Sequence, residues 1–211
     1  MILTLLAAAE DLVWQIERGI AILKRGGVVA FPTDTVYGLG AASNNPGAVR
    51  RVFEVKLRPL SLALPILLAE PDDVDKVAVD VSPTARKLIQ GFWPGALTLV
   101  LKKSDSVFDI ITASSKTVAV RTPSHHVAVA LIKGVGVPLV GTSANVSGQP
   151  SPLTAAEVET QLGDRIGLII DGGTAPLGVE STIVDASIDP PRLLREGVIP
   201  RAELEKVCHI A

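Results

Sequence analysis

The stretch Phe31-Pro32-Thr33-Asp34-Thr35-Val36-Tyr37-Gly38-Leu39-Gly40 is the most informative part of the sequence. It overlaps the end of a short apolar segment, Val28 to Phe31, which is typical of a buried β-strand. Beyond that strand, four side chains able to form hydrogen bonds are followed by glycines, which let the backbone and a ligand approach closely. Taken alone, such a loop more often caps or turns the chain than takes part in chemistry.

Two later loops repeat this combination of hydroxyl groups and glycines. They are Gly141-Thr142-Ser143-Ala144-Asn145-Val146-Ser147-Gly148 and Gly178-Val179-Glu180-Ser181-Thr182. Three loops of the same chemical character suggest one shared pocket. The segment Gln149 to Pro152 follows the second loop, and its proline and serine content indicates a mobile loop and a candidate lid.

The composition favours one globular domain over residues 1–211, because 47% of the 211 residues are hydrophobic and can form a substantial core. The net charge of −2 argues against wholesale electrostatic binding to nucleic acid or to an anionic membrane, so any anion site must be a focused one. The one cysteine, Cys208, excludes an internal disulfide and a multi-cysteine metal site, which suits a reducing cytosol.

The sequence predicts a cytoplasmic protein without membrane contact. Its first residues, Met1 to Ala9, are apolar but lack the basic leader of a signal peptide. The longest apolar stretch, Leu62 to Ala69, is far too short to cross a bilayer and contains Pro65.

Short β-type segments alternate with helical patterns, which predicts an α/β fold. No helical pattern separates Gly167 to Ile170 from Thr182 to Val184, so we expect a mixed sheet and not a purely parallel one. Helices are expected from Leu12 to Leu23, Pro46 to Lys56, Ser82 to Gln90, Ser124 through Leu131 and Thr154 to Leu162; strands are expected at Val28–Phe31, Leu97–Leu101, Thr117–Val120, Val137–Val140, Gly167–Ile170, Thr182–Val184 and Arg192–Leu194.

Several common binding and catalytic motifs are absent from the sequence. It contains neither the Walker phosphate loop nor the Gly-x-Gly-x-x-Gly pattern of dinucleotide folds. The nucleophile elbow Gly-x-Ser-x-Gly fails because Asn145 replaces its last glycine, so Ser143 is predicted to bind a ligand and not to act as a nucleophile. His125 and His126 are adjacent and should point in different directions in regular structure, so we expect no histidine metal site.

Basic residues stand at the predicted ends of several elements. Lys56 and Arg58 end a helix, and Arg121 and Arg195 end strands. Each alone fits a solvated surface cation. Beside three hydroxyl-rich loops they are the parts of a site for phosphate and carboxylate, because arginine offers a planar fork to oxyanions and lysine a point charge.

Seven motifs occur together and in the order found in the YrdC-like threonylcarbamoyl-AMP synthases, which the chain resembles from about Ala21 to Pro200. The motifs are Pro32-Thr33-Asp34-Thr35-Val36-Tyr37-Gly38-Leu39, Lys56-x-Arg58-Pro59, Phe92-Trp93-Pro94-Gly95, Arg121-x-Pro123, Gly141-Thr142-Ser143-Ala144-Asn145, Glu180-Ser181-Thr182 and Arg195-Glu196-Gly197. The resemblance is to the short form, without an additional C-terminal domain. It implies an open, twisted, mixed α/β sheet with flanking helices around a positively charged cavity.

The resemblance also implies an activity. It predicts a nucleotidyltransferase that condenses L-threonine, bicarbonate and ATP into threonylcarbamoyl-AMP and releases pyrophosphate. A downstream transferase complex would then move the threonylcarbamoyl group to the adenosine beside the anticodon of tRNA. Mg²⁺ is expected to accompany ATP, held by phosphate and water and not by a carboxylate cage, so no residue is predicted as a metal ligand.

The resemblance further implies roles for ten residues. Thr35, Arg121, Gly141 and Ser181 are predicted to bind threonine; Lys56 and Arg58 are predicted to be catalytic and to contact the ATP phosphates; Thr117, Ser143, Asn145 and Arg195 are predicted to hold the nucleotide. Many members carry an Asn-Pro-Leu-x-x-His segment whose asparagine and histidine are here replaced by Leu62 and Leu67. This departure leaves the amino-acid selectivity open.

Other motif residues have two interpretations each. Asp34 either organises its own turn or acts directly, Glu180 either orients a basic residue or caps a strand, and Tyr37 belongs to the core or to the cavity wall. The segment Phe92 to Gly95 is interpreted as a packing turn.

Two alternative functions remain. One is an RNA-binding module that uses the same positive cavity, against which the net charge and the few aromatic residues argue. The other is a carbamoyl-adenylating module of the kind found in hydrogenase maturation proteins, where the similar domain is embedded in a much longer chain.

Overall fold

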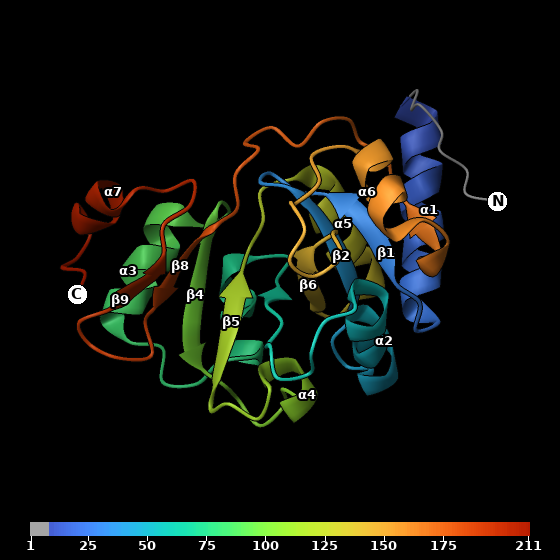
Figure 1. The fold of residues 1–211 in the computed structure, drawn as a ribbon. Helices are drawn as coiled ribbons and strands as arrows, with labels where there is room; N and C mark the ends of the chain where they lie inside the picture. Colours follow the sequence, from blue (N-terminus) through green and yellow to red (C-terminus); the bar gives the residue numbers. More distant parts are fainter. Residues whose placement is uncertain (1–8) are drawn as a thin grey trace.

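Nine short strands form one sheet in the computed structural model, which describes residues 9–211 (Figure 1). Their order across the sheet is β7-β1-β2-β6-β3-β5-β4-β8-β9. The strands are β1 Val29–Pro32, β2 Tyr37–Ala42, β3 Ile66–Leu67, β4 Leu97–Lys102, β5 Thr117–Arg121, β6 Leu139–Ser143, β7 Leu168–Ile169, β8 Thr182–Asp185 and β9 Arg192–Arg195.

The sheet is mixed, as the sequence predicted. Strand β1 pairs parallel with β7, β3 with β5, and β4 with β8, whereas the other five neighbouring pairs are antiparallel. Strands β7 and β8 are consecutive in the chain but lie near opposite edges of the sheet. The connection between them therefore crosses the molecule, and Glu180 and Ser181 lie at its end, directly before β8.

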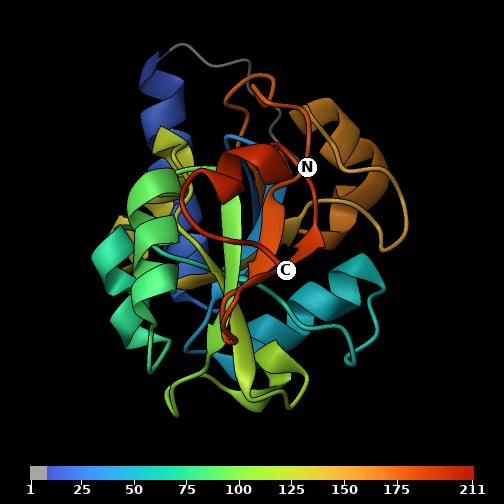
Figure 2. The same ribbon diagram turned by 90° about the vertical axis from the view of Figure 1, so that its left-hand side faces the viewer.

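Helices cover both faces of this sheet. Figure 2 shows α1 (blue) and α3 (green) on one side, with α2 (cyan) and α6 (brown-orange) on the other. The helical segments are α1 Ala9–Lys24, α2 Pro46–Lys56, η1 Pro71–Lys76, α3 Pro83–Phe92, α4 Asp109–Thr112, α5 His126–Val135, α6 Ala155–Leu162, η2 Gly163–Arg165 and α7 Arg201–Glu205. None of the helices within residues 9–211 combines the length and apolar character needed to cross a membrane.

Side-chain caps explain where three helices begin. Asn45 accepts a hydrogen bond from the Ala48 amide at the start of α2, and Ser82 accepts one from the Ala85 amide at the start of α3. Thr154 accepts from the Glu157 amide at the start of α6. Each bond satisfies a donor that the first helical turn cannot pair internally, so the predicted starts of these helices are confirmed.

The sequence predicted that α5 begins at Ser124, and this prediction was wrong by one residue. Helix α5 is capped by His125, whose Nδ1 accepts from the Val127 amide, whereas the Ser124 amide donates to the carboxylate of Asp34. The two histidine rings also do not diverge: they stack with centroids 4.7 Å apart and planes at 21°. The reason is that His125 is in an extended conformation and only His126 is helical, so the alternation of regular structure does not apply.

Strand β2 differs from the prediction, because its residues belong to the run that the sequence indicates as a loop beside a ligand. All six residues of Tyr37–Ala42 are buried, so they show no polar alternation. A Cβ atom at Gly40 would lie 2.9 Å from the Phe31 ring and 3.0 Å from the Val140 carbonyl oxygen. That glycine therefore serves close packing between strands and not ligand access. Strand β6 also starts later than predicted and extends to Ser143, which places that residue on a strand.

The core follows the strand alternation. Val29 and Phe31 belong to an apolar cluster beneath α1 and α5, whereas Val28 and Ala30 belong to a larger cluster that includes residues of α2 and α6. Opposite faces of β1 are thus both buried. Tyr37 is fully buried, and its hydroxyl donates to the Gly173 carbonyl oxygen at 2.7 Å, so it is a core residue.

We predict that Gly197→Ala destabilises the fold by about 1–3 kcal/mol, because the added Cβ would overpack a rigid backbone. That Cβ would lie 2.2 Å from the Glu180 carbonyl oxygen and 2.7 Å from the Ser181 carbonyl carbon. Gly91→Ala is the control: its Cβ meets only Val207, at 3.6 Å, and alanine suits a helix. Urea unfolding of both variants checks this, and equal stabilities would contradict the packing argument.

Candidate functional site

A cavity of about 600 Å³ lies over the middle strands of the sheet, β6, β3 and β5, each of which contributes to its lining. Its size is typical of sites for small molecules and cofactors. The turn between β1 and β2, the end of α2, strands β4 and β6 and the segments around β8 and β9 all contribute to its lining. The structure brings nine of the ten predicted site residues to this cavity: Thr35, Lys56, Arg58, Arg121, Gly141, Ser143, Asn145, Ser181 and Arg195.

Thr117 is the exception. It begins strand β5, whereas Arg121 ends the same strand inside the cavity. The Thr117 hydroxyl shares a 2.9 Å hydrogen bond with the Ser115 hydroxyl. The structure therefore places Thr117 outside the cavity lining, and Ala119 is the β5 residue that lines the wall between the two.

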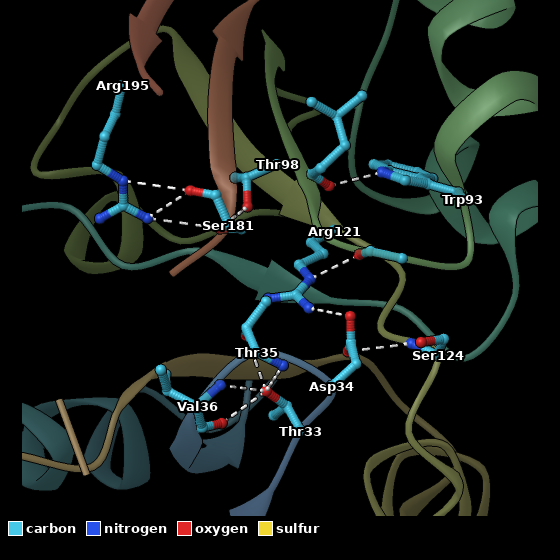
Figure 3. Close-up of polar contacts among 12 residues, drawn as sticks. Thr33, Asp34, Thr35, Val36, Trp93, Thr98, Arg121, Ser124, Ser181 and Arg195 are labelled. Carbon is cyan, nitrogen blue, oxygen red and sulfur yellow. Dashed lines mark hydrogen bonds and ion pairs between the residues drawn. The ribbon is translucent and has the colours of Figure 1, made fainter. Parts of the chain in front are cut away.

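A buried ion pair organises one end of the cavity (Figure 3). The Nη2 of Arg121 lies 2.6 Å from Oδ2 of Asp34, and each residue is only 6% exposed. The same guanidinium donates through Nη1 to the Thr35 hydroxyl at 2.8 Å and through Nε to the Gly95 carbonyl oxygen at 2.8 Å. Burial lowers the pKa of Arg121 and the Asp34 carboxylate opposes that shift. Asp34 thus acts through an ion pair and not by organising its own turn.

The turn that carries Asp34 is held by Thr33. Its hydroxyl donates to the Val36 carbonyl oxygen at 2.6 Å and accepts from the amides of Thr35 and Val36 (Figure 3). These bonds pair backbone groups of the turn that joins strands β1 and β2. The result is a fixed turn that directs the Thr35 hydroxyl toward Arg121.

Lys56 is almost completely buried, at 1% exposure, although it ends helix α2. Its ammonium donates to the carbonyl oxygens of Ser143 at 2.5 Å and Asn145 at 2.7 Å, and to the Asn145 side-chain oxygen at 3.2 Å. Burial lowers the pKa of Lys56 to about 7; Arg58 adds to the lowering and Glu180 opposes it. The three oxygen dipoles stabilise the protonated amine, which alone can fill all three acceptors.

Arg58 faces a different environment. Residue Leu57 has left-handed backbone angles, φ 52° and ψ 41°, and ends the helix between the two cations. Arg58 donates to the carbonyl oxygens of Leu62 at 3.2 Å and Ala63 at 2.9 Å, and no carboxylate within residues 9–211 forms an ion pair with it. Its charge is therefore available to an anionic ligand.

Arg195 and Glu180 form an ion pair at the mouth of the cavity. Arg195 also donates to the Ser181 carbonyl oxygen, and Glu180 accepts from the Ser151 hydroxyl at 2.6 Å. Glu180 thus orients a basic residue, which is one of its two predicted roles. The bond from Ser151 also connects the segment 149–152, the candidate lid, to Glu180 in the cavity lining.

One residue of the cavity wall, Thr98, was not predicted from the sequence. Thr98 shares a 2.8 Å hydrogen bond with the Ser181 hydroxyl, but it lies in the apolar strand β4 and carries no sequence signal (Figure 3). Leu67 lines the cavity next to Gly141, whereas Leu62 is exposed outside it.

The Phe92 to Gly95 segment packs as predicted: the Trp93 indole is buried and donates to the Leu97 carbonyl oxygen.

The charges of the cavity lining favour the binding of an oxyanion and not of a metal ion. The lining contains four cations and one carboxylate, Glu180, which is already paired. Within residues 9–211, no group of three or more histidine, cysteine, aspartate or glutamate side chains is arranged to hold a metal ion. The fold and the site therefore define a mixed α/β protein whose cavity is suited to phosphate and carboxylate ligands.

Comparison with known proteins identifies the family. The Sua5/YciO/YrdC family model, described as telomere recombination, matches residues 21–197, and the chain belongs to this family. Proteins named threonylcarbamoyl-AMP synthase from Pyrococcus abyssi and Bacillus subtilis are 45% and 43% identical over 92% of the chain, which spans 57% and 56% of their lengths. The crystal structure of P. abyssi Sua5 with L-threonine superposes with a TM-score of 0.90 at 44% identity, covering 94% of this chain and 59% of that one.

We predict that Arg121→Met lowers the free energy of unfolding by about 3–5 kcal/mol, because it leaves the Asp34 carboxylate buried without a cation. Adding Asp34→Asn should restore part of the loss. Lys133→Met is the matched control, since it breaks a pair with Glu70 in which both side chains are 55% exposed, and should cost less than about 1 kcal/mol. Denaturant unfolding measures all three variants, and a similar small loss for Arg121→Met and Lys133→Met would contradict the account.

We also predict that sulfate binds the cavity more weakly as the pH rises through about 7. Lys56 is charged below its lowered pKa of about 7 and neutral above it, so the cavity loses one positive charge over that range. Sulfate keeps a constant charge there, and its affinity is measured by protection against thermal unfolding at several pH values. Lys56→Met should abolish the pH dependence; an unchanged dependence in that variant would show that another group causes it.

Proposed function

We propose that the protein is a threonylcarbamoyl-AMP synthase, which condenses L-threonine, bicarbonate and ATP and releases pyrophosphate. The observation that carries the proposal is one cavity in which Arg121 and Thr35 lie at one end and Arg58, Ser143 and Asn145 line the same space. A carboxylate and a phosphate chain can therefore be held together. The names of the P. abyssi and B. subtilis relatives support the same reaction.

The proposed chemistry needs positioning more than a reactive side chain. The threonine amine attacks the carbon of bicarbonate, water leaves, and an oxygen of the resulting carbamate attacks the α-phosphorus. The bond from that phosphorus to its bridging oxygen then breaks and frees pyrophosphate. Three oxyanions must meet in one enclosed cavity, which fixed cations and hydroxyl groups favour.

We assign the two ends of the cavity to different substrates. Thr35, Arg121, Gly141 and Ser181 are proposed to receive threonine, whose carboxylate pairs with the N–H groups of Arg121 that Asp34, Thr35 and Gly95 leave unused. Residues on the other side are proposed to serve the nucleotide. They are Arg58 at the phosphates, Lys56 as a nearby positive charge, and Ser143, Asn145 and Arg195 along the rest of the ligand.

Thr117 was also predicted to contact the nucleotide. Such a contact requires the base or ribose to extend beyond the wall at Ala119, because Thr117 itself does not line the cavity. We therefore place Thr117 at the outer end of the nucleotide path.

Mg²⁺ is proposed to enter with ATP. Glu180 is the one carboxylate among the described lining residues, and its ion pair with Arg195 occupies it. These residues do not fit a dedicated magnesium site. Phosphate oxygens and water would hold the ion, as is common for this metal.

Leu67 bears on the choice of amino acid. It stands in the cavity wall where many family members carry a histidine, and a Cβ on Gly141 would lie 2.3 Å from its Cδ1. We propose that this apolar wall contacts the threonine methyl group, while nearby hydroxyl groups, including that of Ser181, hold its polar atoms. We further propose that the chain acts as one domain in the cytoplasm and passes its product to a tRNA-modifying transferase complex.

The experiment is pyrophosphate release from ATP by the purified protein, with L-threonine and bicarbonate each present or omitted. We expect release only with both, and less when serine replaces threonine. Arg58→Met should slow it by about 100-fold through loss of charge stabilisation at the phosphates. Arg51→Met, which removes an exposed arginine of α2, is the control. Release without threonine would indicate a different adenylation, and none under any condition would favour a binding role, including an RNA-binding one.

A further inference from the structure

The most unusual side chain in the cavity is Lys56, because a buried lysine here donates only to backbone and amide oxygens. We propose that Lys56 is a positioning residue whose ammonium holds residues 143–149, the last residue of strand β6 and the loop that follows it, in the shape that presents Ser143 to the nucleotide. The proposal rests on the proposed function for the identity of that ligand. The clamp itself is a property of the protein alone.

Geometry supports a clamp over a direct phosphate contact. An ammonium group has three N–H donors, and three oxygens of Ser143 and Asn145 lie within 3.2 Å of it. All the donors are thus engaged within the protein. A phosphate that bound Lys56 directly would have to displace one of these oxygens and leave it buried without a donor, which is costly.

The main chain of Lys56 binds the same loop. Its carbonyl oxygen accepts from the Ser147 amide at 2.8 Å, so both ends of this residue hold residues 143–147 against the end of helix α2. The Asn145 amide group extends the network, because its Nδ2 donates to the carbonyl oxygens of Val146 at 2.9 Å and Gln149 at 2.6 Å. Loss of the ammonium would therefore loosen the loop as a unit.

The spacing of Lys56 and Arg58 gives the two cations separate roles. Left-handed Leu57 turns the chain between them, so Lys56 is buried against the loop and Arg58 reaches the carbonyl oxygens of Leu62 and Ala63. Arg58 is the cation that can exchange these carbonyl contacts for a phosphate. Lys56 then acts on the nucleotide through Ser143 and Asn145.

The first test measures hydrogen–deuterium exchange in Lys56→Met without any ligand. We expect the amides of Ser147 and Gln149 to exchange about 10-fold faster, as for the loss of a hydrogen bond to a charged donor. Lys24→Met is the matched control, because Lys24 also ends a helix but is exposed, and it should change nothing. Lys56→Gln retains two N–H donors and should recover part of the protection; it also replaces Lys56→Met if that variant fails to fold.

The second test measures affinity for ATP and for L-threonine by calorimetry in the same variants. The clamp predicts about 10-fold weaker ATP binding in Lys56→Met, partial rescue in Lys56→Gln and threonine affinity changed less than twofold. Unchanged exchange with weaker ATP binding would overturn the clamp in favour of a direct phosphate contact. Faster exchange with unchanged ATP affinity would reduce Lys56 to a structural residue. If exchange rises but the wild type binds neither substrate, the clamp stands and the proposed function fails.

Discussion

The ion pair between Arg121 and Asp34 is the contact on which the site depends. Asp34 belongs to the turn between β1 and β2, whereas Arg121 ends β5, and strands β6 and β3 lie between them in the sheet. The pair therefore joins the two halves of the sheet above its middle strands. Because both groups are buried, neither can be lost without leaving an uncompensated charge. The Gly95 carbonyl oxygen and the Thr35 hydroxyl fix the guanidinium further, so one end of the cavity is rigid before any ligand arrives.

Charge is distributed unevenly along the cavity. Arg121 and Arg195 each have a carboxylate partner, whereas Lys56 and Arg58 donate only to oxygens without formal charge. The unpaired positive charge thus lies on the side where the end of α2 meets the loop after β6. This explains how a chain with a net charge of −2 can offer a strongly positive site, since a focused field depends on local arrangement and not on the total. It also favours a polyphosphate on that side and a single carboxylate at Arg121.

Sequence patterns predicted the positions of helices and strands better than the contacts between side chains. The caps at Ser82 and Thr154 are local signals, and local hydrogen bonds determine where those helices begin. Strand β2 could not be recognised, because four of its six residues are glycine or alanine, which have low β-propensity, whereas the apolar run of β1 marks a buried strand. The motifs predicted which residues gather at the cavity, with Thr117 the exception, but not their partners. That Asp34 neutralises Arg121, or that Lys56 is buried against carbonyl oxygens, depends on distant segments meeting in space, which the order of residues does not reveal.

If one cavity joins threonine, bicarbonate and ATP, as we propose, isotope incorporation will reveal it in a single experiment. The purified protein is incubated with ATP, L-threonine and ¹³C-bicarbonate, and the nucleotide products are analysed by mass spectrometry at once. We expect an adenylate that contains threonine and gains one mass unit from the labelled carbon. An adenylate of threonine without the label, or AMP and ADP as the only products, would contradict it.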